Sequence, residues 1–84
     1  MSFINVCFIK SGQPINIQAT SDMMFAELAL KYFQKTGVKP EDDPKFIFNS
    51  QELVTDSCKT LDDLHIIDGA RIEVVIGKDV IGAN

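Results

Sequence analysis

The sequence predicts an α+β domain in which one main helix covers one face of a mixed sheet of four to five strands. Residues 3–9 and 14–20 alternate apolar and polar side chains on either side of a short turn that contains Gly12, a pattern typical of a β-hairpin. Residues 24–33 then change to helical spacing, and apolar strand-like runs follow. A hairpin followed by one amphipathic helix and returning strands must bury that helix against one face of the sheet.

Both hairpin strands are expected to turn one set of alternate residues toward the helix. Ser21 and Asp22 supply an N-cap signal for the helix, Gly37 is placed to end it, and Pro40 prevents its resumption. The strand residues expected on the helix side are Ile4, Val6 and Phe8, followed by Ile15, Ile17 and Ala19. The apolar helix face comprises Met24, Phe25, Leu28 and Tyr32, with Ala29 and Phe33 at its margin.

The second half of the chain is predicted to return to the sheet through short elements. Thr60 followed by Asp63 resembles a capping box, which favours one short helical turn after it. The most apolar strands are the first and the last, so we expect them to lie adjacent and parallel in the middle of the sheet. The expected elements are a loop over 39–44, strands over 45–48 and 51–53, a polar loop over 54–60, a helical turn over 61–64 and a strand over 71–76.

Composition limits the range of functions. The chain has 84 residues, so we expect one domain over residues 1–77 and a flexible C-terminal tail over residues 78–84. Its net charge is −4 and its Lys and Arg residues are scattered, which argues against nucleic acid or an anionic membrane as a partner. No apolar run approaches the length of a transmembrane helix. Two distant cysteines form no disulfide framework, so a reducing compartment, cytoplasmic or nuclear, is expected.

Residues with catalytic or metal-binding chemistry do not form a recognisable site in the sequence. Cys7 and Cys58 have no basic neighbour to stabilise a thiolate, and His65 has no nucleophile paired with it. The acidic run that begins at Glu41 lacks the spacing of a calcium loop. We therefore expect no enzyme activity, no cofactor and no metal, and we keep a small hydrolase or thiol enzyme as a competing hypothesis.

Four segments carry a resemblance to a known family. Residues 45–53 (KFIFNSQEL), 60–66 (TLDDLHI) and 68–72 (DGARI) match its sheet, turn and final-strand motifs, and the helix that ends at Gly37 matches its helix. On these segments, over residues 3–76, the chain resembles the ubiquitin-like family, which includes ubiquitin and SUMO. The resemblance implies a ubiquitin-like β-grasp fold. It also implies a module whose partners are other proteins, similar to the receptors of ubiquitin or of SUMO.

One departure from this family concerns conjugation. Conjugated members end in a diglycine, because an activating enzyme must reach an unhindered C-terminal glycine. Here Gly77 and Gly82 are single. The sequence therefore predicts a non-covalent binding module that acts as a monomer. The alternatives kept open are a covalent modifier of the ubiquitin or SUMO type, or its precursor, a sulfur carrier, and a SUMO-like peptide-groove binder.

The first candidate site is the sheet face away from the helix. Ile47 alternates with Phe46 and Phe48, so it is expected on that face, where an apolar patch would mark a partner site. Ile47 and Val75 match the Ile and Val that ubiquitin presents to its receptors, and Glu73 stands where ubiquitin has His. The residues expected to bind partners are Ile47, Val75, Ile9, Cys7, Glu73 and Gln51.

The second candidate site is the groove between the second strand and the helix. In SUMO this groove accepts an extended apolar peptide as an added strand, and Lys35 matches a basic groove residue of SUMO. The residues expected to line it are Ile15, Ile17, Lys31 and Lys35. In the alternative interpretation, Pro14 and polar side chains keep this strand as an unpaired edge.

Overall fold

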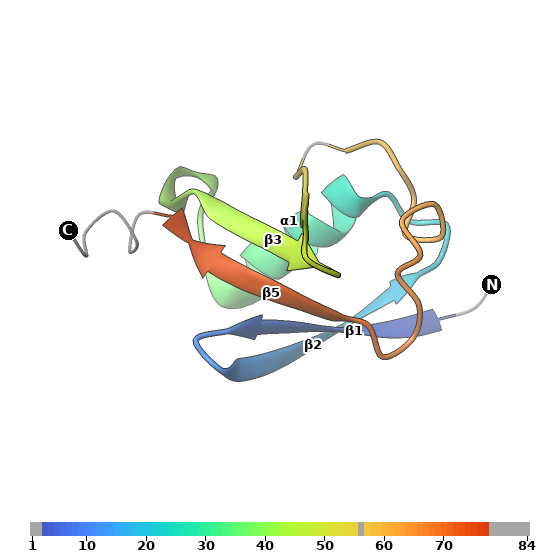
Figure 1. The fold of residues 1–84 in the computed structure, drawn as a ribbon, viewed down its shortest axis with the longest axis horizontal. Helices are drawn as coiled ribbons and strands as arrows, with labels where there is room; N and C mark the ends of the chain where they lie inside the picture. The colour runs from blue at the N-terminus through green and yellow to red at the C-terminus, as the bar shows by residue number, and fades with distance from the viewer. Residues whose placement is uncertain (1–2, 56, 78–84) are drawn as a thin grey trace.

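A computed structural model describes residues 3–55 and 57–77, and it confirms the ubiquitin-like β-grasp fold (Figure 1). One helix and a 3-10 turn accompany a five-stranded sheet in the order β2-β1-β5-β3-β4. The predicted flexible tail, residues 78–84, lies outside the described residues. The elements are β1 (Phe3–Lys10), β2 (Gln13–Thr20), α1 (Phe25–Thr36), the 3-10 turn η1 (Pro40–Asp42), β3 (Pro44–Phe48), β4 (Gln51–Leu53) and β5 (Arg71–Ile76).

The first and last strands are parallel neighbours in the middle of the sheet, as predicted. Phe8 of β1 pairs with Ile72 of β5. The other strand pairs are antiparallel, with β2 at one edge and β4 at the other. Because the two central strands have neighbours on both sides, their alternate residues can fill the core without exposing backbone polar groups.

The core lies between α1 and one face of the sheet, and Figure 1 shows α1 crossing behind the strands. Phe8, Tyr32 and Phe46 are fully buried there and come from β1, α1 and β3. The Tyr32 ring centroid lies 4.7 Å from that of Phe8 and 5.5 Å from that of Phe46, the latter in an edge-to-face arrangement. This aromatic contact joins the helix to both halves of the sheet. Within residues 3–55 and 57–77, no helix covers the opposite sheet face.

The Tyr32 hydroxyl is a polar group within this core. It has no hydrogen-bond partner among the described residues. The Thr36 hydroxyl, one turn further along α1, donates instead to the Tyr32 carbonyl over 2.8 Å. Burial raises the pKa of Tyr32, and the neighbouring Thr36 hydroxyl offsets part of that effect.

The helix begins later than the sequence predicts. Its N-cap is Met24 rather than Ser21 or Asp22, and Met24 is exposed instead of joining the apolar helix face. The Glu27 carboxylate accepts a hydrogen bond from the Met24 N–H over 3.1 Å. Ser21 does not cap the helix but contacts a distant segment, because its carbonyl accepts a hydrogen bond from the N–H of Asp62 over 3.0 Å. The C-terminal end is as predicted, with Gly37 in the left-handed conformation.

The predicted capping box is present, although the segment after it is a hydrogen-bonded turn rather than a helix. The Thr60 hydroxyl accepts from the Asp63 N–H over 3.0 Å, and the Asp63 carboxylate accepts from the Thr60 N–H over 3.2 Å. One helical bond, from the Leu64 N–H to the Thr60 carbonyl, follows at 3.1 Å. Within the segment predicted as a loop over 39–44, Pro40–Asp42 forms a 3-10 turn.

Candidate functional site

The sheet face opposite α1 carries the apolar residues that the sequence assigns to partner binding. Phe46 pairs with Val74 across β3 and β5, and both are buried beneath α1. Because successive side chains of a strand point to opposite faces, Ile47 and Val75 lie on the outer face. The same alternation in β1 places Cys7 and Ile9 there, since Val6 and Phe8 are buried. We call these four residues, Cys7, Ile9, Ile47 and Val75, the sheet patch.

Glu73 lies at the centre of the sheet patch. It pairs with Ile9 of β1 on one side and with Ile47 of β3 on the other. Val75 follows two residues later on the same strand and face, opposite Lys45. Glu73 is exposed, whereas each member of the sheet patch is half-buried. Glu73 therefore has apolar neighbours on three sides and Arg71 on the fourth, and the members of the patch retain surface that a partner can cover.

A hollow adjoins the sheet patch between the β1–β2 turn and the end of β5. Its volume is about 480 Å³. Ile9 and Val75 contribute apolar walls, Glu73 contributes a carboxylate, and Ser11 and Gly12 contribute the turn. The hollow has the mixed apolar and charged lining that suits a single long side chain of a partner better than an enclosed ligand.

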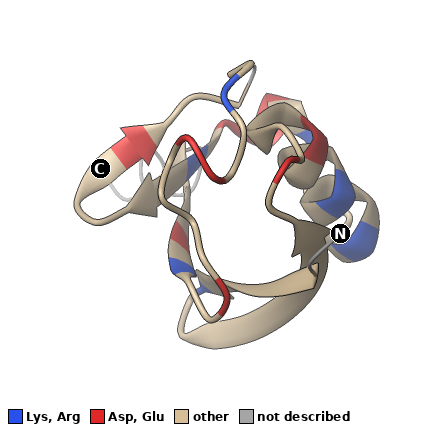
Figure 2. Ribbon diagram, turned by 90° about the vertical axis from the view of Figure 1, so that its right-hand side faces the viewer, with Lys and Arg blue, Asp and Glu red and all other residues tan. Residues whose placement is uncertain are grey.

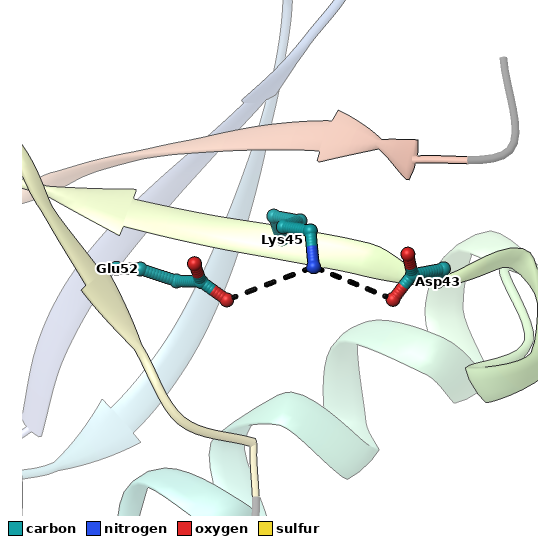
Figure 3. Close-up of polar contacts among 3 residues, drawn as sticks. All are labelled: Asp43, Lys45 and Glu52. Carbon is teal, nitrogen blue, oxygen red and sulfur yellow. Dashed lines mark ion pairs between the residues drawn. The ribbon is translucent and has the colours of Figure 1, made fainter. Parts of the chain in front are cut away.

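Lys45, which lies on the same sheet face as Ile47, forms two ion pairs (Figure 3). Its Nζ lies 3.6 Å from the Asp43 Oδ1 atom and 3.9 Å from the Glu52 Oε2 atom. All three side chains are about half exposed, so each pair contributes little to stability, about 0–1 kcal/mol. Their main effect is on charge, because Lys45 is neutralised by two carboxylates. This cluster was not predicted from the sequence, because it depends on the register that pairs Ile47 with Glu52 across β3 and β4.

Gln51 is the member of the predicted set that the structure separates from the patch. It pairs with Phe48 at the start of β4, and Phe48 packs against the core. Residues that pair across two strands share a face, so the exposed Gln51 side chain lies on the helix side of the sheet. Gln51 therefore does not extend the sheet patch.

The predicted peptide groove between β2 and α1 has only part of its lining. Ile17 is 5% exposed and belongs to the core, so little of its side chain is available to line a groove. The same alternation that placed it beside Ala19 on the helix side buries it. Ile15 is half-buried against the core, and Lys31 is exposed.

The Lys35 side chain occupies one backbone acceptor on the β2 edge of this groove. The Cys7 N–H donates to the Ala70 carbonyl over 2.8 Å, so Cys7 faces β5, and its β2 partner Asn16 must turn its own backbone groups outward. The Lys35 Nζ donates to that outward Asn16 carbonyl over 2.9 Å. Pro14, the next outward position, lacks an N–H. A strand added at this edge would lose both groups.

A second hollow, which was not predicted from the sequence, lies between one flank of α1 and the segment that contains η1 and the start of β3. Leu30 is 56% exposed there, beside the half-buried Phe33, Pro40 of η1 and Pro44 of β3. The sequence signal was present in Leu30, an apolar residue on the polar side of the helix. Isolated apolar residues of this kind are common on protein surfaces, which is why the spacing alone did not select it.

The remaining reactive residues form no second site in the part of the chain that the structure describes. Cys7 and Cys58 are free, and His65 is an exposed turn residue with a positive φ. Over residues 3–55 and 57–77, no three His, Cys, Asp or Glu side chains are placed to hold a metal ion. No described helix has both the length and the apolar character needed to cross a bilayer. In Figure 2 acidic and basic positions are distributed around the ribbon rather than gathered on one side.

Comparison with known families agrees with this geometry. The family model described as "Ubiquitin-2 like Rad60 SUMO-like" matches residues 8–76, which include all of the sheet patch except Cys7. The chain belongs to this SUMO-like family of ubiquitin-like domains. Ubiquitin-like domains are generally non-enzymatic modules that bind other proteins. No curated protein matches the sequence.

Solved structures share the fold of this SUMO-like domain. A designed protein based on ubiquitin is similar with a TM-score of 0.73 and 26% identity, covering 87% of each chain. Ubiquitin from Caldiarchaeum subterraneum has a TM-score of 0.76 and 13% identity, covering 89% of this chain and 94% of that one. A crystal structure of ATBAG1 in complex with HSP70 has a TM-score of 0.75 and 18% identity, covering 95% of this chain and 46% of that one.

Proposed function

We propose that this SUMO-like domain binds partner proteins non-covalently through the sheet patch. The observation that carries the proposal is the arrangement of Ile9, Ile47 and Val75 around Glu73 on the face opposite α1. Alternation along three strands turns these apolar side chains away from the core, so they contribute little to folding and remain available to a partner. Cys7 extends the same surface along β1.

The size of the sheet patch suits a transient interface. Four half-buried side chains offer little apolar area, and an interface centred on them belongs at the low end of interface sizes. Affinity would then rest on a small number of well-packed contacts, including those to Ile47, which lies between Glu73 and Glu52. A partner helix or loop that places an apolar side chain on Ile47 and Val75 would bury this centre.

Capture of partners by wild type and by Ile47→Ala tests this proposal. Ile67→Ala is the matched control, because Ile67 is 68% exposed in the loop before β5 and lies outside the sheet patch. Bound proteins are identified by mass spectrometry, and the fold of each variant is checked by circular dichroism. We expect Ile47→Ala to lose proteins that wild type and Ile67→Ala retain. Equal capture by all three folded proteins would refute the proposal.

The SUMO-like family membership favours one second candidate, peptide binding at the β2 edge. Against it stand the burial of Ile17 and the bond between Lys35 and the Asn16 carbonyl. A synthetic peptide with a short aliphatic run distinguishes the two sites, because strand addition would protect the Asn16 and Gln18 amides from hydrogen exchange. Protection at β2 with no effect of Ile47→Ala would favour the groove instead.

Covalent conjugation is the third candidate, and its test is direct. It requires a C-terminal diglycine, which the 84 residues do not contain. Incubation with an activating enzyme, ATP and magnesium would give a thioester if the domain were a modifier. An intact mass of the domain that remains unchanged, with no thioester on the enzyme, is the outcome that a non-covalent module predicts.

A further inference from the structure

We propose that the segment docking on the sheet patch is basic as well as apolar, with a Lys or Arg side chain that reaches Glu73. This inference rests on the proposed function and names the chemistry of the partner. It also makes Glu73 the residue that decides which partners are accepted.

Carboxylates lie on both sides of the central apolar residue. Ile47 pairs with Glu73 of β5 on one side and with Glu52 of β4 on the other. Residues that are directly paired have Cβ atoms about 4.5–5.5 Å apart, so an apolar side chain placed on Ile47 comes close to both acids. A docking segment with Asp or Glu next to its apolar anchor would meet like charge there, which disfavours it.

The cations on this face do not neutralise Glu73. Lys45 is engaged by Asp43 and Glu52, as Figure 3 shows. Arg71 lies two residues before Glu73 on the same strand and face, at the same spacing as Val75 on the other side, and its side chain is exposed. Among residues 3–55 and 57–77 no ion pair involves the Glu73 carboxylate. Glu73 is therefore an available acceptor that has apolar neighbours on three sides and the exposed Arg71 on the fourth.

The hollow beside the sheet patch suits the side chain that would pair with Glu73. Ile9 and Val75 form apolar walls, and the Glu73 carboxylate is part of the lining. A Lys or Arg side chain can lay its methylene stem against such walls and bring its charged end to the carboxylate. Lys10 also lines the hollow, so a partner's cation has to approach from the Glu73 side.

Three synthetic amphipathic peptides test this inference on the intact domain. They share the same apolar positions at helical spacing and differ only in the flanking residues, which are Lys and Arg, Glu, or Gln and Ser. Binding is followed by amide chemical shifts of the isotope-labelled domain. We expect the basic peptide to bind more tightly than the other two, to shift Ile9, Ile47, Glu73 and Val75, and to weaken as salt is raised.

Substitution of the carboxylate completes the test. Glu73→Gln should weaken the basic peptide by about two- to fivefold and reduce its salt dependence, the size expected for one exposed ion pair. Glu41→Gln, an exposed carboxylate in η1 away from the sheet patch, should change neither.

Failure of the charge inference and failure of the proposed function give different results. Sheet-patch shifts from the neutral peptide, with no preference for the basic one and no effect of Glu73→Gln, would overturn the charge inference and leave the proposed function standing. Tighter binding of the acidic peptide would overturn the charge inference in the same way. If all three peptides shift residues outside the sheet patch only, both proposals are wrong.

Discussion

The ε-ammonium group of Lys35 in α1 donates a hydrogen bond of 2.9 Å to the backbone carbonyl of Asn16 in β2. The bond ties the last turn of the helix to the edge of the sheet and occupies a backbone acceptor that would otherwise face solvent. Exposed strand edges are templates for pairing with other chains, and lysine is one of the residues that commonly protect them. The side of the domain on which SUMO-like peptide binding would occur is thus partly occupied by the domain's own side chain.

Removal of this cation should make the β2 edge more available. In Lys35→Met the Asn16 carbonyl loses its donor, and we expect either measurable self-association or tighter binding of an extended aliphatic peptide. Lys31→Met is the control, because Lys31 is exposed on the same helix. Sedimentation velocity at several concentrations and peptide titration measure the two effects. Identical behaviour of Lys35→Met and Lys31→Met would show that Lys35 does not protect the edge.

Leu28 and Leu30 give a second, paired prediction on one helix. Leu28 is fully buried, so Leu28→Ala leaves a cavity in the core and should lower the free energy of unfolding by about 2–5 kcal/mol. Leu30 is largely exposed, and Leu30→Ala should change it by about 0.5 kcal/mol or less. Urea denaturation of both variants measures the difference. Similar losses in the two variants would mean that the helix is oriented differently.

Tyr32 should make the domain sensitive to alkaline pH. Because burial raises its pKa in the folded state, the folded protein keeps the phenol proton at pH values where the unfolded chain releases it. The protonated phenol of Tyr32 therefore makes its full contribution to the free energy of unfolding below the unfolded-state pKa of about 10. That contribution is lost as the pH rises through the raised pKa of the folded state. Tyr32→Phe should remove this loss. It should also raise the free energy of unfolding at neutral pH by about 1 kcal/mol, since the buried hydroxyl has no hydrogen-bond partner in the part of the chain that the structure describes.

The chain contains a single tyrosine, so its ionisation can be followed directly. Ultraviolet absorbance of the phenolate reports Tyr32 alone, and denaturation at several alkaline pH values compares wild type with Tyr32→Phe. Effects of alkaline pH that do not involve the phenol are common to both proteins and cancel in the comparison. An ordinary tyrosine pKa in the folded protein, or equal alkaline destabilisation of the two, would contradict this account of the core.

Alternation along the strands predicted the sheet patch because it depends only on local geometry. Once Phe46 is assigned to the core, Ile47 must lie on the other face, and the same holds for Val75 beside Val74. The position of Gln51 needed the register between β3 and β4, which the local pattern does not contain. The Lys45 ion pairs depend on that same register, so the sequence analysis missed them.

The start of α1 was mispredicted because a distant segment competes for its backbone. Ser21 is a good cap by type, yet its carbonyl accepts from Asp62, and the N–H of Leu61 donates to the Met23 carbonyl over 2.8 Å. These contacts hold residues 21–23 in a turn and bend outside the helix, and the helix can begin only after them. The burial of Ile17 could not be predicted from alternation alone. An apolar residue that lines a groove and an apolar residue in the core give the same alternating pattern along a strand.

The footprint of a captured partner on the domain is the measurement that tests the proposed binding face most directly. Amide chemical-shift mapping with the partner identified by capture should perturb Cys7, Ile9, Ile47, Glu73 and Val75 most strongly, and Ile47→Ala should abolish those changes in a folded domain. A footprint centred on Leu30 of α1 or on the β2 edge, with the sheet patch unaffected, would contradict the account.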